Sequence, residues 1–154
     1  MGLLIDGHNL IPKIAGMSLR MLDDEPRLIE LLQVYSRVRR QQVEVFFDQA
    51  PPGSSGRRKV GLVVAHFVRQ GRTADESIVA RLDQLEKSAR NWTVVTSDRH
   101  VQSEARIRQV KIIPSEQFAP DLMDAQRQSQ SNSPSGADKM SDADLDEWLK
   151  LFGE

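Results

Sequence analysis

Four aspartates stand at the ends of strand-like segments, where carboxylates from distant parts of a chain can meet. They are Asp6, Asp48, Asp75 and Asp98. Parallel strands present their carboxyl ends along one rim of a sheet, so acids placed there converge on one small site. Crowded carboxylates repel one another unless a cation holds them, and Mg²⁺ prefers oxygen ligands. The pattern therefore predicts a metal-dependent enzyme that cleaves phosphodiester bonds.

Each aspartate also has a purely structural explanation. Asp6 and Gly7 form a turn pair, and Asp98 can cap a helix. The segment 73–76 is a capping box in which Asp75 would only favour the helix dipole. Capping and metal ligation are compatible, however. The joint placement of the acids at β-to-α junctions favours the metal site, because one ion needs two or three carboxylates from different elements.

Alternating strand-like and helix-like segments predict the scaffold that positions these acids. Apolar runs predict strands near residues 2–5, 43–47, 61–67, 92–96 and 110–113. Helices are expected to begin at residues 24–26 and at Thr73, and a short helix is expected over 99–108. Residues 51–56 have loop composition and continue into the basic residues 57–59. This order favours an open α/β sheet with right-handed crossovers.

Length and composition limit the class of protein. The 154 residues suffice for one compact domain with a core, which we place at residues 1–119. No run approaches the roughly 20 apolar residues that span a bilayer. The first residues lack the pattern of a signal peptide, so the cytoplasm is the expected compartment. The absence of cysteine excludes disulfides and thiolate metal sites.

The last part of the chain differs from the rest. Residues 120–140 have the polar composition of a flexible linker, and residues 141–154 are predicted to form a short amphipathic, acidic helix. Four apolar residues recur there at helical spacing: Leu145, Trp148, Leu149 and Phe152. We expect this stripe to dock on the chain's own domain or on a second copy in a homodimer. The alternative is a disordered acidic tail.

Three short acidic motifs follow one another along the chain: Ile5 to Asn9 (IDGHN), Thr73 to Glu76 (TADE) and Thr96 to Asp98 (TSD). Over roughly residues 2–118 the chain thereby resembles the YacP-like branch of the NYN domain family, within the PIN-like ribonuclease superfamily. The resemblance implies a PIN-like open, mainly parallel five-stranded sheet of order 3-2-1-4-5 flanked by helices. It also implies an RNA-cleaving site that depends on Mg²⁺ or Mn²⁺.

The resemblance also implies roles for individual residues. Asp6, Asp75 and Asp98 would be the catalytic, metal-binding acids. Glu76 and Asp48 would be additional metal-site acids, and Asn9, Ser97 and Thr73 polar supports. His8 departs from the branch, which often has an aromatic such as Tyr there. No histidine is assigned a catalytic role.

The basic residues fit an RNA substrate. Residues 1–118 carry 14 acids and 18 bases, and 15 of the chain's 21 bases are arginine, which suits phosphate contacts. Those predicted to bind RNA are Arg72, Arg99, Arg57, Arg58, Lys59 and Arg69. The alternative for them is ordinary solvated surface. Few aromatics are present, so stacking and sequence selectivity are expected to be weak.

Two other functions remain open at this point. The domain could be a non-catalytic RNA-binding module, against which the intact set of three aspartates argues. It could instead be an α/β enzyme acting on a small phosphorylated metabolite, against which the basic residues 57–59 argue.

Overall fold

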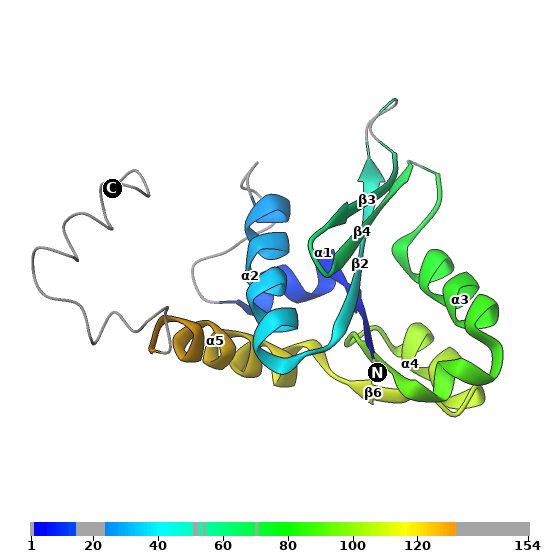
Figure 1. Cartoon of the computed structure of the whole chain (residues 1–154). Helices are drawn as coiled ribbons and strands as arrows, with labels where there is room; N and C mark the ends of the chain where they lie inside the picture. Colours follow the sequence, from blue (N-terminus) through cyan, green and yellow to red (C-terminus); the bar gives the residue numbers. More distant parts are fainter. Residues whose placement is uncertain (1, 15–23, 51–52, 54, 70, 132–154) are drawn as a thin grey trace, which may run out of the picture.

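A six-stranded mixed sheet forms the centre of the molecule (Figure 1). The computed structural model describes residues 2–14, 24–50, 53, 55–69 and 71–131. The strand order is β3-β4-β2-β1-β5-β6. The strands are β1 (Gly2–Asp6), β2 (Gln42–Ala50), β3 (Gly56–Val60), β4 (Val63–Arg69), β5 (Trp92–Val95) and β6 (Lys111–Ile113).

Five of these strands are the predicted ones, in the predicted order, and all their pairings are parallel. The prediction of a five-stranded sheet is nevertheless wrong, because β3 adds an antiparallel edge strand on β4. Strand β3 was not predicted because its residues Arg57, Arg58 and Lys59 lack the alternation of apolar and polar side chains that indicates a strand. Their sequence is typical of a loop. An edge strand can carry such charges, since it pairs on one side only. Gly61, with φ +61°, forms the tight connection to β4.

Helices cover both faces of the sheet. They are α1 (Gly7–Leu10), α2 (Asp24–Arg39), α3 (Ala74–Leu85), α4 (Arg99–Ile107) and α5 (Ser115–Ser131), with 3-10 turns η1 (Ile11–Lys13) and η2 (Glu86–Asn91). Helices α2 and α5 pack on one face, around Leu28, Leu32 and Phe118. Helices α3 and α4 pack on the other, around Ile78 and Val101. Figure 1 shows these two pairs on opposite sides of the strands. The sheet is therefore buried on both faces, as expected for a mainly parallel sheet.

Helix α5 corrects the predicted start of the flexible linker. Residues 120–131 of that segment are helical, with Pro120 inside the helix. Leu122 and Ala125 are fully buried against the core, and Asp121 bonds to the hydroxyl of Tyr35 at 3.1 Å. The pattern was missed because proline usually ends a helix, whereas here the packing of residues 118, 122 and 125 offsets the lost hydrogen bond. Residues 132–140 and the predicted amphipathic segment 141–154 lie outside the described residues.

Among the described residues, no helix has the length and apolar character needed to cross a bilayer.

Candidate active site

Asp6 is the last residue of β1 and lies at the carboxyl rim of the sheet. Only 9% of the residue is exposed, and its Oδ2 atom accepts a hydrogen bond from the Thr96 hydroxyl at 3.3 Å. The pKa of Asp6 is raised to about 6, mainly by burial; the charges of Asp48 and Asp98 also raise it, and the hydrogen bond from Thr96 lowers it. The carboxylate of Asp6 is thus an ionisable group held where negative charge is already concentrated.

The predicted turn at Asp6 and Gly7 takes another form. Strand β1 extends through Asp6, and α1 begins directly at Gly7. A Cβ atom at position 7 would clash with the ring of Phe47. Glycine is therefore required here by close packing of the strand end against β2, and the packing fixes Asp6 at the rim.

Asp75 and Asp98 stand at the N-termini of two helices on the same face. Thr73 caps α3 by accepting a hydrogen bond from the Glu76 amide at 3.2 Å. Asp98 caps α4, where its Oδ1 atom accepts bonds from the amides of His100 and Val101 at 2.8 and 3.2 Å. Both predicted caps are present. Because the helix dipole favours anions at an N-terminus, the ionised form of both carboxylates is stabilised at these positions.

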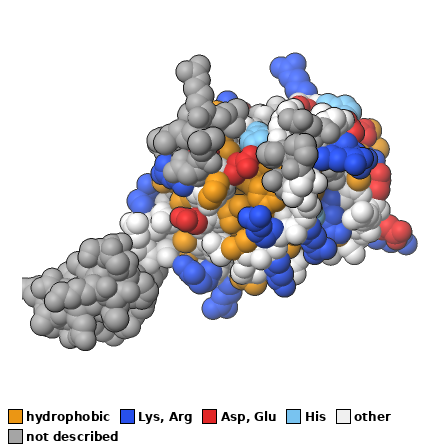
Figure 2. Space-filling model, turned by 90° about the horizontal axis from the view of Figure 1, so that it is seen from above, with side chains coloured by type: hydrophobic (Ala, Val, Ile, Leu, Met, Phe, Trp, Pro, Cys, Tyr) orange, Lys and Arg blue, Asp and Glu red, His pale blue; other side chains and the backbone are white. Residues whose placement is uncertain are grey.

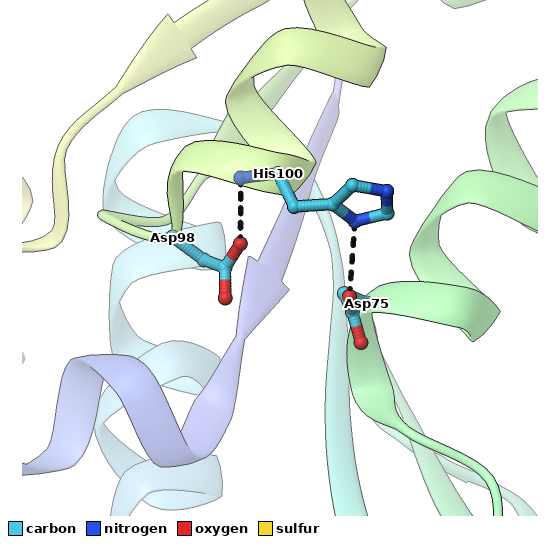
Figure 3. Close-up of side chains that lie close together, drawn as sticks. All are labelled: Asp75, Asp98 and His100. Carbon is cyan, nitrogen blue, oxygen red and sulfur yellow. Dashed lines mark hydrogen bonds and ion pairs between the residues drawn. The ribbon is translucent and has the colours of Figure 1, made fainter.

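His100 brings these two carboxylates together with a third donor. Its Nδ1 atom lies 3.1 Å from Oδ2 of Asp75, and the close-up in Figure 3 shows the imidazole reaching from α4 to the start of α3. One ligand atom from each of Asp75, Asp98 and His100 lies within 4.8 Å of the others. The hydrogen bond from Thr73, and then that of His100, lowers the pKa of Asp75.

Sequence reasoning did not find His100, because an isolated histidine is an ordinary surface residue. A usable signal was its position two residues after a cap acid, within the first helical turn. Glu76, predicted as an additional acid, is exposed beside Asp75 and does not belong to the group of three.

Asp48 is held by His8, and its Oδ2 atom accepts a hydrogen bond at 3.5 Å from the Ala74 amide at the start of α3. The Nδ1 atom of His8 is 2.8 Å from Asp48, and its Nε2 atom is 2.6 Å from Glu25. The hydrogen bond with Glu25 is the main cause that raises the pKa of His8, and the bond with Asp48 adds to it. Glu25 comes from the first turn of α2 and was not predicted. His8 thus ties helix α2 to the rim.

Asn9 and Ser97 hold the loops around the site. The Asn9 side-chain oxygen accepts hydrogen bonds from the Ser97 amide at 2.8 Å and from the Ser115 hydroxyl at 2.7 Å. The Ser97 hydroxyl donates to Glu116 and accepts from the Ser115 amide at 3.0 Å. These bonds connect the segments after β1, β5 and β6, which are adjacent in the sheet.

Predicted RNA-binding residues line a cavity of about 410 Å³ between α3 and the β3–β4 hairpin. The walls include Arg57, Arg69 and Arg72, which form no ion pair with any described carboxylate. We call this cavity the arginine groove. Lys59 and Arg99 are exposed outside it, and Arg58 lies over the ring of Phe67 at 5.3 Å. Seen from above in Figure 2, acidic and histidine side chains lie together with basic side chains around them.

A fourth arginine of the groove is already neutralised. Arg81 binds both carboxylate oxygens of Glu44 at 3.0 and 2.8 Å, and His66 lies 2.8 Å from the same group. Burial opposes ionisation of Glu44, but the bonds from His66 and Arg81 hold its pKa below the ordinary value. This cluster lies beside the groove, and it leaves Arg57, Arg69 and Arg72 as the arginines of the lining that pair with no carboxylate in the described part of the chain.

The sheet order and the acids along its carboxyl rim define a PIN-like α/β domain. The YacP-like NYN domain family matches residues 3–151, so the chain belongs to that family of PIN-like nucleases. The match extends beyond residue 118, the expected end of the resemblance. No curated protein matches the chain.

Two solved structures share the fold. One is the crystal structure of Rae1 (YacP) from Bacillus subtilis, with 23% sequence identity and a TM-score of 0.72. The alignment covers 99% of this chain and 92% of the Rae1 chain. The other is the crystal structure of its W164L mutant, with 21% sequence identity and a TM-score of 0.74. This alignment covers 97% of the present chain and 91% of the mutant chain.

Proposed function

We propose that this protein is a divalent-metal-dependent ribonuclease that hydrolyses RNA at the carboxyl rim of the sheet. The observation that carries the proposal is the meeting of Asp75, Asp98 and His100 within 4.8 Å. The buried Asp6 lies outside this group, but the charge of Asp98 acts on it. Membership of a PIN-like nuclease family supports it.

The donor set fits a divalent cation. Two carboxylates and an imidazole present their ligand atoms to one another. The pKa of Asp6 is raised first by burial, and the charges of Asp48 and Asp98, which a cation would offset, add to this effect. Asp6, Asp75 and Asp98 would hold the ion, with Asp48, Glu76 and His100 next to them. Carboxylates suit both Mg²⁺ and Mn²⁺, and imidazole nitrogen favours the transition metal. When bound, the cation would lower the pKa of a water molecule and neutralise charge on the phosphate.

The other residues of the site have binding and positioning roles in this proposal. Thr96 orients Asp6, and Asn9 and Ser97 fix the loops that carry the acids. Arg72 and Arg99 each stand close in sequence to one of the acids and would hold the scissile or flanking phosphates. Because guanidinium groups remain charged and bind phosphate oxygens in pairs, the arginine groove would hold the strand beyond the cut.

A polymer is favoured over a small metabolite by the extent of the basic surface. Arg57, Arg58 and Lys59 continue along β3, away from the rim acids. A single phosphorylated metabolite bound at Asp75 and Asp98 would leave these cations without a function, whereas an RNA backbone would follow them.

The test is incubation of the purified protein with single-stranded RNA in Mg²⁺, in Mn²⁺ and in excess chelator. We expect cleavage with either metal, faster in Mn²⁺, and none in chelator. Equal cleavage in chelator would contradict the metal site. RNA binding without cleavage under all three conditions would instead support the non-catalytic binding module.

A further inference from the structure

A second cavity, of about 600 Å³, lies between α2 and the strands β2, β3 and β4. It is lined by residues from each of these elements: Glu25, Pro26, Ile29, Glu30, Gln33, Asp48, Gln49, Ala50, Arg58, Val60 and Phe67. Its volume lies within the roughly 300–1,000 Å³ typical of small-ligand sites. It shares Asp48 with the rim acids, Phe67 with the arginine groove and Arg58 with the basic residues of β3, while the rest of its lining has no role assigned above. We call it the α2 pocket.

The α2 pocket is continuous with the acidic site through Asp48. This residue lines the pocket, and its charge also acts on Asp6 at the rim. The pairing register of β2 with β4 shifts between Phe47 and Ala50, as at a β-bulge. Gln49 in this stretch has φ +65°, a left-handed conformation that is rare for a residue other than glycine. Bulges redirect side chains, and such local strain is typical of functional sites. Here the bulge supplies two residues, Asp48 and Gln49, to the pocket lining.

One wall of the pocket suits a flat ring. The aromatic ring of Phe67 is half-buried, and the Arg58 guanidinium lies over it at 5.3 Å. Ile29 and Val60 extend the apolar surface. Nucleobases stack on aromatic side chains and on guanidinium planes. Phe47 stacks on the same ring at 5.5 Å, so the exposed face of the Arg58 guanidinium, supported by Phe67, is the surface on which an unstacked base would bind.

The charge of the lining disfavours phosphate as the occupant. Three acids, Glu25, Glu30 and Asp48, outnumber one cation, Arg58. His8 binds Glu25 and Asp48, so Glu30 is the acid of the lining that does not share this histidine. The arginine groove on the other side of the hairpin has the opposite charge. Carboxylate and amide oxygens at Glu30, Gln33 and Gln49 accept hydrogen bonds from amino groups. The lining therefore fits an uncharged ring that carries an exocyclic amino group.

From these observations we propose that the α2 pocket binds one nucleobase of the RNA, next to the scissile phosphate, and selects a base with an exocyclic amino group over uracil. This inference rests on the proposed ribonuclease function and replaces the weak sequence selectivity expected from the low aromatic content. Phe67 and Arg58 supply stacking, and Glu30 supplies selectivity.

The binding test uses short single-stranded RNAs in which one base is 2-aminopurine, whose fluorescence changes on stacking. Chelator is present, so the measurement requires no cleavage. We expect the wild-type protein to change the fluorescence on binding. Arg58→Ala and Phe67→Leu, which keeps an apolar side chain, should weaken binding by about tenfold. Arg90→Ala and Glu86→Gln, exposed in η2 before β5, are the matched controls and should bind as the wild type does.

The cleavage test maps the cut sites in a random-sequence RNA pool with metal present. We expect enrichment of amino-bearing bases at one position beside the cut, and loss of that enrichment in Glu30→Gln but not in Glu86→Gln. If the cut sites show no base preference at any position, or if RNA binding leaves the fluorescence unchanged, the proposal of a base-binding pocket is wrong. Neither result would contradict the proposed ribonuclease activity. If no RNA is cleaved, the ribonuclease proposal fails and the fluorescence result alone decides whether the pocket binds a base.

Discussion

The Nδ1 atom of His100 lies 3.1 Å from the Oδ2 atom of Asp75, which joins the first turn of α4 to the first turn of α3. Asp98 caps the same turn of α4 through the amide of His100. One residue therefore contacts both acids, through its backbone to one and through its side chain to the other (Figure 3). The relative position of the two carboxylates depends on this contact.

Replacement of His100 by alanine should weaken metal binding. It removes either a ligand or the group that orients Asp75, and the loss of such orienting partners lowers metal affinity by roughly 10–100-fold. Calorimetric titration with Mn²⁺ measures the change directly. Arg106→Ala, in the last turn of the same helix, is the control. Wild-type affinity in His100→Ala would show that the imidazole has no part in the site.

Replacement of Asp6 by asparagine should stabilise the metal-free protein near neutral pH. The pKa of Asp6 is about 6 in the fold, against the ordinary value of 3.8 for an aspartate. The folded state therefore binds more protons than the unfolded state between these values, and wild-type stability falls as pH rises through that window. Relative to the variant, the loss amounts to at most about 3 kcal/mol. Urea unfolding in chelator at about pH 4 and about pH 7.5 measures it, and an unchanged difference between the two proteins would contradict the burial argument.

Replacement of His8 by alanine should destabilise the fold more at low pH than at high pH. The pKa of His8 is raised, first by its bond with Glu25. Its charge-dependent contribution is thus complete below about pH 6.5 and is lost as pH rises through the folded pKa. We expect a difference of about 1 kcal/mol between unfolding free energies at about pH 6 and about pH 8.5. Glu25→Gln should reduce the same pH dependence, and a pH-independent effect of both variants would contradict the assignment.

Loss of two cations from the arginine groove should weaken RNA binding without changing chemistry. Arg57→Ala combined with Arg69→Ala, both in the groove lining, is expected to raise KM and leave kcat near the wild-type value. If each residue contacts one phosphate, the slope of log affinity against log salt should become shallower by about 0.7 per residue on single strands. Arg90→Ala controls for net charge. An equal change in that control would mean that the groove has no special role.

Much of the scaffold follows from local sequence, because buried parallel strands are apolar runs that end in recognisable turns. The acids at positions 6, 75 and 98 were identifiable for the same reason, since each adjoins a strand end or a helix cap. Strand β3 was not identifiable, because its pairing depends on β4 across the turn at Gly61 rather than on its own side chains.

The unpredicted residues of the site depend on tertiary contacts. Glu25 reaches His8 over 17 positions of sequence, and His100 reaches Asp75 over 25. The extent of α5 was also hidden, because the burial of Leu122 against the sheet opposes the local effect of Pro120. Spacing within one element cannot report contacts of this kind.

The most direct test of the account is RNA cleavage by Asp98→Asn in Mn²⁺. Asparagine is as good an N-cap as aspartate, so α4 and the fold should persist, as circular dichroism can verify, while one ligand charge is lost. We predict at least about a hundredfold loss of cleavage rate, with Asp124→Asn, an exposed surface acid paired to Arg127, retaining the wild-type rate. Cleavage by folded Asp98→Asn at the wild-type rate would contradict the proposed metal site.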